Sequence, residues 1–173
     1  MSSWLEARGG YREPPSRHMT AQVCVNGHPT TDSLENSPEL AAKFCASCGA
    51  ATIRACPNCN APIRGYYYVP GVISLRTYEP PRYCHNCGKS FPWTAQAIKT
   101  AEELTDEIEA LDANEKAALK SAITDLTTDT PKTELASVRY RKLLAKAGTP
   151  IANAMGKIII SVVTEAAKKA IGL

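Results

Sequence analysis

Four pairs of metal-ligating residues constrain this chain more than any other feature of its sequence. The pairs use all seven cysteines and one histidine: Cys24 and His28, Cys45 and Cys48, Cys56 and Cys59, and Cys84 and Cys87. A structural Zn²⁺ binds four Cys or His ligands in a tetrahedron, so eight ligands predict two complete sites with no cysteine left over. The glycines after Cys48 and Cys87 supply the positive φ that a CxxC turn often needs. We therefore expect two Zn²⁺ per chain.

A disulfide framework or a redox motif explains these cysteines less well. The N-terminal residues contain no apolar signal segment behind a basic start, so we expect a cytoplasmic protein rather than one from an oxidising compartment. A thioredoxin-like motif would place one CxxC in a βαβ unit, whereas three CxxC pairs recur here between short stretches rich in glycine and proline.

The first site is complete only if His28 is its fourth ligand. Without His28 the site would have three protein ligands and an open position, which is the arrangement of a catalytic zinc. The Glu base of a motif such as H-E-x-x-H is missing nearby. His18 lies in the N-terminal arm, and His85 would strain to reach the ion bound by its flanking cysteines. We therefore expect His28 as the ligand and no enzymatic activity.

The order of pairing decides the fold of this region. Sequential pairing gives two zinc ribbons, each made of two knuckles joined by a short hairpin, whereas interleaved pairing gives a cross-brace. Seven residues separate Cys48 from Cys56, which suits either topology. A self-contained ribbon needs less loop closure before its metal binds, and this favours sequential pairing.

The residues around the ligand pairs also resemble a known family. The relevant runs are Ala-Gln-Val-Cys-Val-Asn-Gly-His (21–28), Pro-Ile-Arg-Gly-Tyr-Tyr (62–67), Tyr-Glu-Pro-Pro-x-Tyr-Cys (78–84) and Cys-Gly-Lys-Ser-Phe-Pro-Trp-Thr (87–94). The stretch from Ala21 through Trp93 resembles a bacterial family of uncharacterised zinc-ribbon proteins, carried as a domain of unknown function. Within it, Cys-Val-Asn-Gly-His (24–28) followed by Lys-Phe-Cys-Ala-Ser-Cys-Gly (43–49) looks like the first half of the double zinc ribbons common in bacterial proteins. The resemblance implies metal binding and a helical tail, and it brings no established activity.

Composition changes at Trp93, where cysteine, glycine and aromatic residues give way to Ala, Leu, Ile, Glu and Lys. We therefore expect an α+β fold of three regions: a flexible N-terminal arm (1–20), a double zinc-ribbon domain with short β-strands (21–92) and an α-helical domain (93–173). The ribbons alone cannot bury a sizeable core, so the two metals would stabilise them.

Apolar periodicity and helix-start signals predict four helices in the last region, over 94–111, 113–127, 131–147 and 150–171. Thr94 is the expected cap of the first helix. Asp112, with Glu115 three residues later, resembles a capping box at the start of the second. Threonine followed by proline, at 130–131 and again at 149–150, marks the other two starts.

The last expected helix is apolar over a broad face. Four charged residues interrupt it, so it is not a membrane span: Lys157, Glu165, Lys168 and Lys169. Packing against the other helices is the first interpretation, and self-association into a homo-oligomer through the remaining apolar surface is the second. Contact with a membrane surface is the weakest, because the helix has no Trp or Phe.

Charge is separated along the helical region. Residues 94–129 carry three Lys and nine Asp or Glu, whereas residues 130–173 carry eight Lys or Arg and two Glu. The two halves could attract each other within one bundle as solvated faces of opposite sign. The alternative is a basic patch for phosphate groups or acidic partners, made by Arg139, Arg141, Lys142 and Lys146.

The segment between Cys59 and Cys84 is the richest candidate for recognition. Its partner-binding candidates are Arg64, Tyr67, Arg76 and Arg82, whereas Tyr66 and Tyr68 would cover the ribbon from one strand face. Tyr and Arg suit a protein interface, and they also suit single-stranded nucleic acid. We expect a zinc-binding adaptor whose ribbons recognise a protein partner and whose helical tail mediates assembly, with nucleic-acid binding as the alternative.

Overall fold

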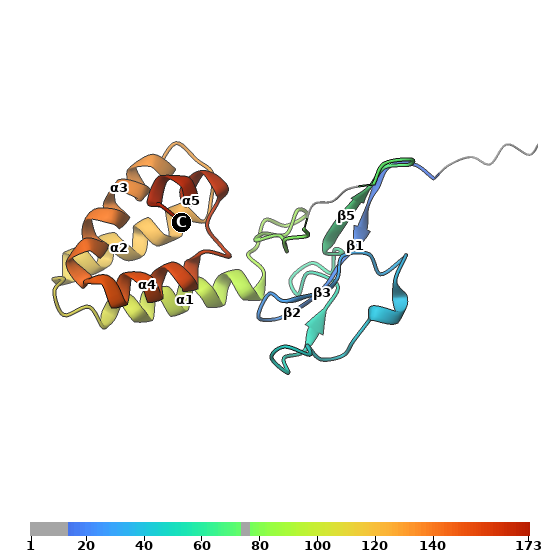
Figure 1. The fold of residues 1–173 in the computed structure, drawn as a ribbon, viewed down its shortest axis with the longest axis horizontal. Helices are drawn as coiled ribbons and strands as arrows, with labels where there is room; N and C mark the ends of the chain where they lie inside the picture. Colours follow the sequence, from blue (N-terminus) through green and yellow to red (C-terminus); the bar gives the residue numbers. More distant parts are fainter. Residues whose placement is uncertain (1–13, 74–76) are drawn as a thin grey trace, which may run out of the picture.

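The structure of the protein, a computed structural model, describes residues 14–73 and 77–173. Two parts follow each other along the chain: a region of short strands and turns, and a group of helices packed together (Figure 1). Each part has its own hydrophobic core. The α+β fold class expected from the sequence is thus confirmed.

The strands form two small antiparallel sheets. In the first, β1 (Arg17–Thr20) pairs with β5 (Arg64–Tyr68). In the second, β2 (Gln22–Cys24) lies between β3 (Pro29–Thr31) and β4 (Thr52–Ile53). The arm expected over residues 1–20 is therefore too long by at least four residues, because Arg17–Thr20 are held in a strand by backbone hydrogen bonds to a segment far along the chain.

The core of the strand region is small and built around cysteine ligands. Val23 and Ile63 are fully buried in it, together with Cys56 and Cys84. Phe91 adds the largest fully buried side chain, and the ring of Trp93 stacks on it at 4.7 Å between centroids. Because Trp93 already belongs to the first turn of α1, this core holds the start of the helical part.

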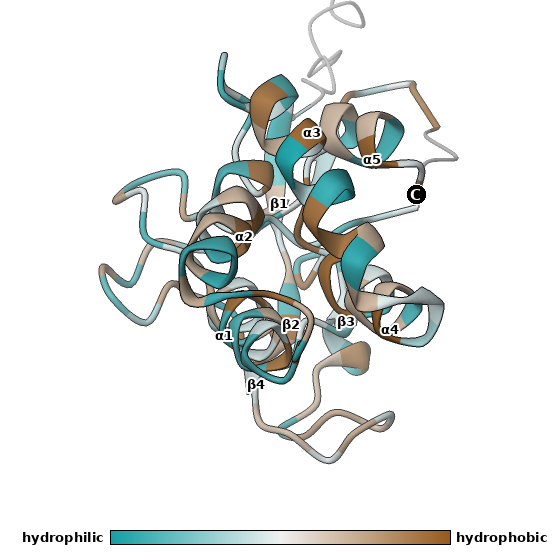
Figure 2. Ribbon diagram, turned by 90° about the vertical axis from the view of Figure 1, so that its left-hand side faces the viewer, coloured by the Kyte–Doolittle hydropathy of each residue, from teal (hydrophilic) through white to brown (hydrophobic). Residues whose placement is uncertain are grey.

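The helical part contains α1 (Pro92–Asp106), α2 (Ala113–Leu126), α3 (Thr133–Leu144), α4 (Thr149–Ile159) and α5 (Glu165–Ile171). Each of the labelled helices carries both hydrophobic and hydrophilic residues around its axis, as amphipathic helices do (Figure 2). Their apolar faces meet in one core, whose fully buried members include Leu119, Ile123, Leu126, Met155, Ile159 and Val163.

The helix starts depend on local capping in some places and on packing in others. Asp112 caps α2 as expected, since its Oδ1 accepts from the Glu115 N–H at 2.9 Å. Thr94 does not cap α1: the helix begins at Pro92, and the buried Thr94 hydroxyl donates to the Arg82 carbonyl at 3.0 Å. Contact with the ribbon region therefore accompanies a start of α1 two residues before the one predicted from the sequence.

The helix expected over 150–171 is interrupted. α4 ends at Ile159 and α5 begins at Glu165, because Thr164 starts a new helix by accepting the Ala167 N–H at 3.1 Å. The Thr164 N–H itself donates to the Leu126 carbonyl at 3.1 Å, so contact with α2 stabilises the break.

The apolar face of this segment lies inside the core of the chain. Ile159 and Val163 are fully buried there, so the face expected to mediate self-association is already covered, and Ile160 stays 45 % exposed. Among the described residues, no helix combines the length and the apolar character that crossing a membrane requires.

Residues next to Cys84 join the two parts of the fold. The Arg82 guanidinium donates to the Val163 carbonyl at 2.8 Å, and the hydroxyls of Tyr83 and Thr127 share a hydrogen bond at 2.6 Å. The Trp93 indole N–H donates to the Pro81 carbonyl at 3.1 Å. The segment before the last knuckle therefore contacts α1, α2 and the turn after α4.

Candidate metal centres

The eight predicted ligands lie in two groups of four. One group holds Cys24, His28, Cys45 and Cys48, and the other holds Cys56, Cys59, Cys84 and Cys87. Within each group, one ligand atom from every residue lies within 4.8 Å of the others. The predicted sequential pairing is the one the structure shows, and each group could hold a metal ion.

Three of the four ligand pairs adopt the same turn. In each CxxC knuckle the first cysteine accepts at its carbonyl from the residue four positions later: Gly49, Asn60 and Gly88, at 2.8, 2.9 and 2.9 Å. All three donors have a positive φ, between 59° and 70°. Asn60 takes the role of glycine at the second knuckle because its short polar side chain tolerates the left-handed region. The knuckles are therefore set by local sequence.

The spacing of the ligand atoms fits a tetrahedral ion. Sulfur atoms lie 3.8 Å apart in Cys24–Cys48 and in Cys56–Cys87, and 3.6 Å apart in Cys59–Cys84. A zinc ion bonded at about 2.3 Å to sulfur and about 2.0 Å to nitrogen separates two sulfurs by about 3.8 Å and a sulfur from a nitrogen by about 3.5 Å. A disulfide would require about 2 Å between sulfurs.

His28 faces the first centre with its Nδ1 atom. This nitrogen lies 3.6 Å from the Cys24 sulfur and 3.7 Å from the Cys45 sulfur, close to the spacing expected when a metal binds all three. The first centre therefore has four protein ligands. The other two histidines are outside both groups.

An asparagine outside the ligand set supports each centre. The Asn26 side chain donates to the Cys48 sulfur, and the Asn86 side chain donates to the Cys59 sulfur, each at 3.5 Å. Both asparagines come two residues after the first ligand of a pair, and both reach the other knuckle of the same centre. We did not identify these residues from the sequence, although the repeat of Asn at this position was available as a signal. Such outer-shell donors orient metal ligands and tune them.

In the metal-free protein, hydrogen bonds and burial give the cysteine thiols different pKa values. The Asn86 side chain is the largest cause that lowers the pKa of Cys59 to about 6, and the backbone N–H of Ala50 does most to lower the pKa of Cys48 to about 6. Burial instead raises the pKa of Cys56 to about 11. Burial also raises the pKa of Cys24 in the first centre. Each centre therefore offers a thiolate that forms readily and a thiol that must lose its proton when metal binds.

The predicted partner-binding residues do not share one surface. Arg64 and Tyr67 are exposed on β5, but residues three apart on a strand project from opposite faces. Arg82 is half-buried and is held by the Val163 carbonyl. Arg76 lies outside the described residues. Tyr67 packs its ring 4.8 Å from the ring of His18, a neighbour that the sequence did not indicate.

Comparison with known proteins places the chain in a family. The family model of DUF2321, described as an uncharacterized protein conserved in bacteria, matches residues 17–171. No curated protein and no solved structure matches the chain. The match covers nearly all of the described residues, so the chain belongs to this family, and the resemblance noted in the sequence is confirmed.

Proposed function

We propose that this member of the DUF2321 family is a zinc-binding adaptor without enzymatic activity, whose ribbons recognise a partner protein. Zinc is the ion best suited to the donor set, because Cys₃His and Cys₄ groups at tetrahedral spacing are the usual structural sites of Zn²⁺. In such small modules metal binding is part of folding, so the ions would hold the ribbon surface rigid.

The ligand count supports a structural role for both ions. A catalytic zinc keeps one coordination position open for water or substrate. Each group here supplies four protein ligands, which fill a tetrahedral site. Metal-centred hydrolysis would require a ligand to leave.

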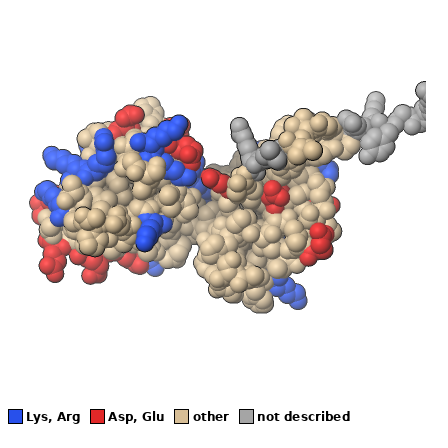
Figure 3. Space-filling model, in the orientation of Figure 1, with Lys and Arg blue, Asp and Glu red and all other residues tan. Residues whose placement is uncertain are grey.

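Exposed aromatic residues on the ribbons carry the proposal of partner recognition. Phe44 is 65 % exposed and Tyr67 is 51 % exposed, although the ribbon core beside them is formed from other side chains. Phe44 directly precedes the ligand Cys45, so a bound metal fixes its position. Few charged side chains lie over the ribbon part in the view of Figure 3, whereas the helical part carries many side chains of both positive and negative charge. Aromatic residues with little charge are typical of the core of a protein interface.

The adaptor role is tested by in-cell crosslinking with matched variants. Phe44→Ser and Tyr67→Ser should each reduce the yield of a crosslinked partner while the zinc content stays at two per chain. Leu135→Ser is the control, because Leu135 is equally exposed, at 51 %, but lies on α3. Loss of the partner in Leu135→Ser alone would show that the helices bind the partner. Unchanged crosslinking in all three variants would contradict the proposal.

Nucleic-acid binding is the second candidate, and one observation favours it. Burial, followed by the charges of Arg64 and His18, lowers the pKa of His85. The pairing of β1 with β5 also places the His18 ring against Tyr67, so basic and aromatic side chains occur together at this sheet. A binding constant for single-stranded RNA or DNA that falls steeply with salt, and that Arg64→Gln weakens, would support this function over the first.

A further inference from the structure

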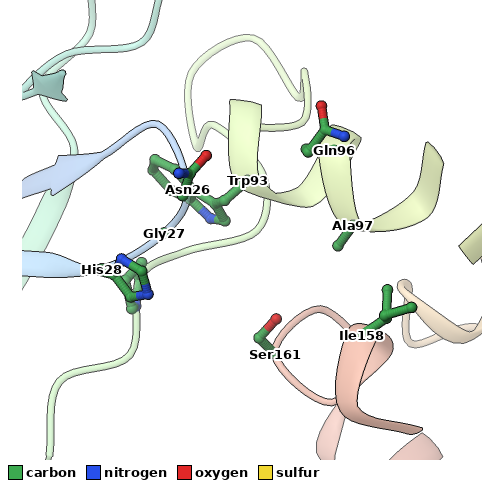
Figure 4. Close-up of a pocket in the computed structure, with 9 residues that line it drawn as sticks. Asn26, Gly27, His28, Trp93, Gln96, Ala97, Ile158 and Ser161 are labelled. Atoms are coloured by element: carbon green, nitrogen blue, oxygen red, sulfur yellow. The ribbon is translucent and has the colours of Figure 1, made fainter. Parts of the chain in front are cut away.

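A cavity lies where the first metal centre meets the helical part. Its volume is about 370 Å³. The turn of residues 26–28 forms one side, the first turns of α1 form another, and Ile158 and Ser161 close it from the end of α4 and the turn after it (Figure 4). Ligand sites often occur at such junctions between modules, and this volume lies in their usual range.

The lining has a neutral character. None of the lining residues is Asp, Glu, Lys or Arg. Trp93, Ala97 and Ile158 supply apolar surface, and His28, Gln96 and Ser161 supply polar groups. A charged ligand would lose its hydration here without gaining a charged partner, so the cavity favours a neutral occupant.

His28 brings a directed hydrogen-bond donor to this cavity. Its Nδ1 faces the sulfurs of the first centre, so in the metal-bound protein the proton of the ring must be on Nε2. A metal-bound histidine almost always donates this second N–H to a carbonyl, a carboxylate or water. His28 is exposed and lines the cavity, and no group of the described residues accepts from its Nε2, so this N–H is open to water or to an incoming ligand.

We propose that this cavity binds a short extended peptide segment of a partner protein, with a backbone carbonyl on the His28 Nε2–H and an aliphatic side chain against Trp93, Ala97 and Ile158. The inference rests on the proposed adaptor function and names the chemistry that the adaptor recognises. A peptide amide is neutral and offers a carbonyl that can replace water as the acceptor of the imidazole N–H. The space would otherwise hold roughly a dozen waters at about 30 Å³ each, enough for a small chain segment but not for a folded domain.

The test uses the zinc-loaded full chain and two probes that both carry a leucine side chain. The first probe is the capped peptide acetyl-Ala-Leu-Ala-amide, and the second is free leucine, whose charged ends the neutral lining should reject. NMR titration of ¹⁵N-labelled protein should show saturable shifts at the Trp93 indole N–H, Ala97 and Ser161 with the capped peptide and none with leucine. Absence of saturable shifts with the peptide, or equal binding of leucine, would overturn the proposal.

Two variants and one control separate the cavity from general surface binding. Ala97→Leu fills the cavity and should weaken peptide binding at least tenfold, whereas Ala95→Leu, exposed on the same helix, should leave it unchanged. His28→Cys keeps four metal ligands but removes the imidazole N–H. If it retains two zinc ions, it should weaken binding roughly tenfold, the effect of one lost hydrogen bond.

The variants also distinguish failure here from failure of the adaptor function. Peptide binding that is equal in wild type and Ala97→Leu would refute the cavity as the site, whatever His28→Cys does. The crosslinking of Phe44 and Tyr67 variants does not depend on the cavity. A partner lost in those variants and kept in Ala97→Leu would leave the adaptor function standing and remove only this inference.

Discussion

Gly27 brings the backbone of the first metal centre close to the helical part. A Cβ added to Gly27 would lie 3.0 Å from the Trp93 Cβ and 3.3 Å from its Cγ. The Trp93 Cβ belongs to the first turn of α1, and its ring is stacked on Phe91, so it has little room to give. Gly27 also has a φ of +92°, which disfavours any residue with a side chain.

The free-energy cost of Gly27→Ala can be separated into these two causes. Gly49, which follows the pair Cys45 and Cys48, also has a positive φ, of +69°, but a Cβ there would meet nothing within 4 Å. Gly49→Ala should therefore cost about 1–2 kcal/mol, for the left-handed backbone alone. Gly27→Ala adds the steric clash with Trp93. Overpacking of this kind costs about 1–3 kcal/mol. We expect the free energy of unfolding of this variant to fall by about 2–5 kcal/mol in total.

Urea unfolding of the zinc-loaded chain, at a buffered concentration of free zinc, measures the difference. In a Trp4→Phe background Trp93 is the only tryptophan, so its fluorescence reports on this contact. Gly27→Ala should be less stable than Gly49→Ala by at least about 1 kcal/mol and should shift the Trp93 emission before unfolding. Equal losses in the two variants, with unchanged emission, would show that the ribbon does not pack on α1 as described.

Four further predictions concern the metal centres and the helical core. Metal analysis should give two Zn²⁺ per chain, and chelation should unfold the ribbons while far-UV circular dichroism keeps the helical signal, because the two cores are separate. Lowering the pH should release metal with uptake of protons, since the Cys56 thiolate, with a pKa of about 11 when free of metal, exists at neutral pH only while the metal holds it. Asn86→Ala should lower zinc affinity about 10- to 100-fold in a chelator competition, whereas Asn58→Ala, which removes no recorded bond to sulfur, should not; equal affinities would contradict the role of Asn86. Ile159→Asp should cost more than about 4 kcal/mol by burying a charge, and Ile160→Asp, at 45 % exposure, less than about 1 kcal/mol; similar thermal melts would refute the described core.

The metal centres were predictable because their information is local. A CxxC turn is closed by hydrogen bonds within five residues, and the residue after it needs only a tolerance for positive φ. Sequential pairing followed from the shorter loops, and Asp112 followed from a capping pattern four residues long. Because these features are satisfied by neighbours in the chain, the sequence alone determined the two ligand groups, the place where strands give way to helices, and the start of α2.

Tertiary contacts decided what depends on residues far apart. The break between α4 and α5 is stabilised by the bond from Thr164 to Leu126, and an apolar periodicity that continues across 159–165 does not reveal that partner. Arg82 was predicted from the sequence as a partner-binding residue, yet its guanidinium is held by the Val163 carbonyl, 81 residues away. The cavity beside His28 exists only because the ribbon and α4 meet there. Local hydrogen bonding fixes the turns and caps, whereas the arrangement of the two parts depends on packing between surfaces that no short stretch of sequence contains.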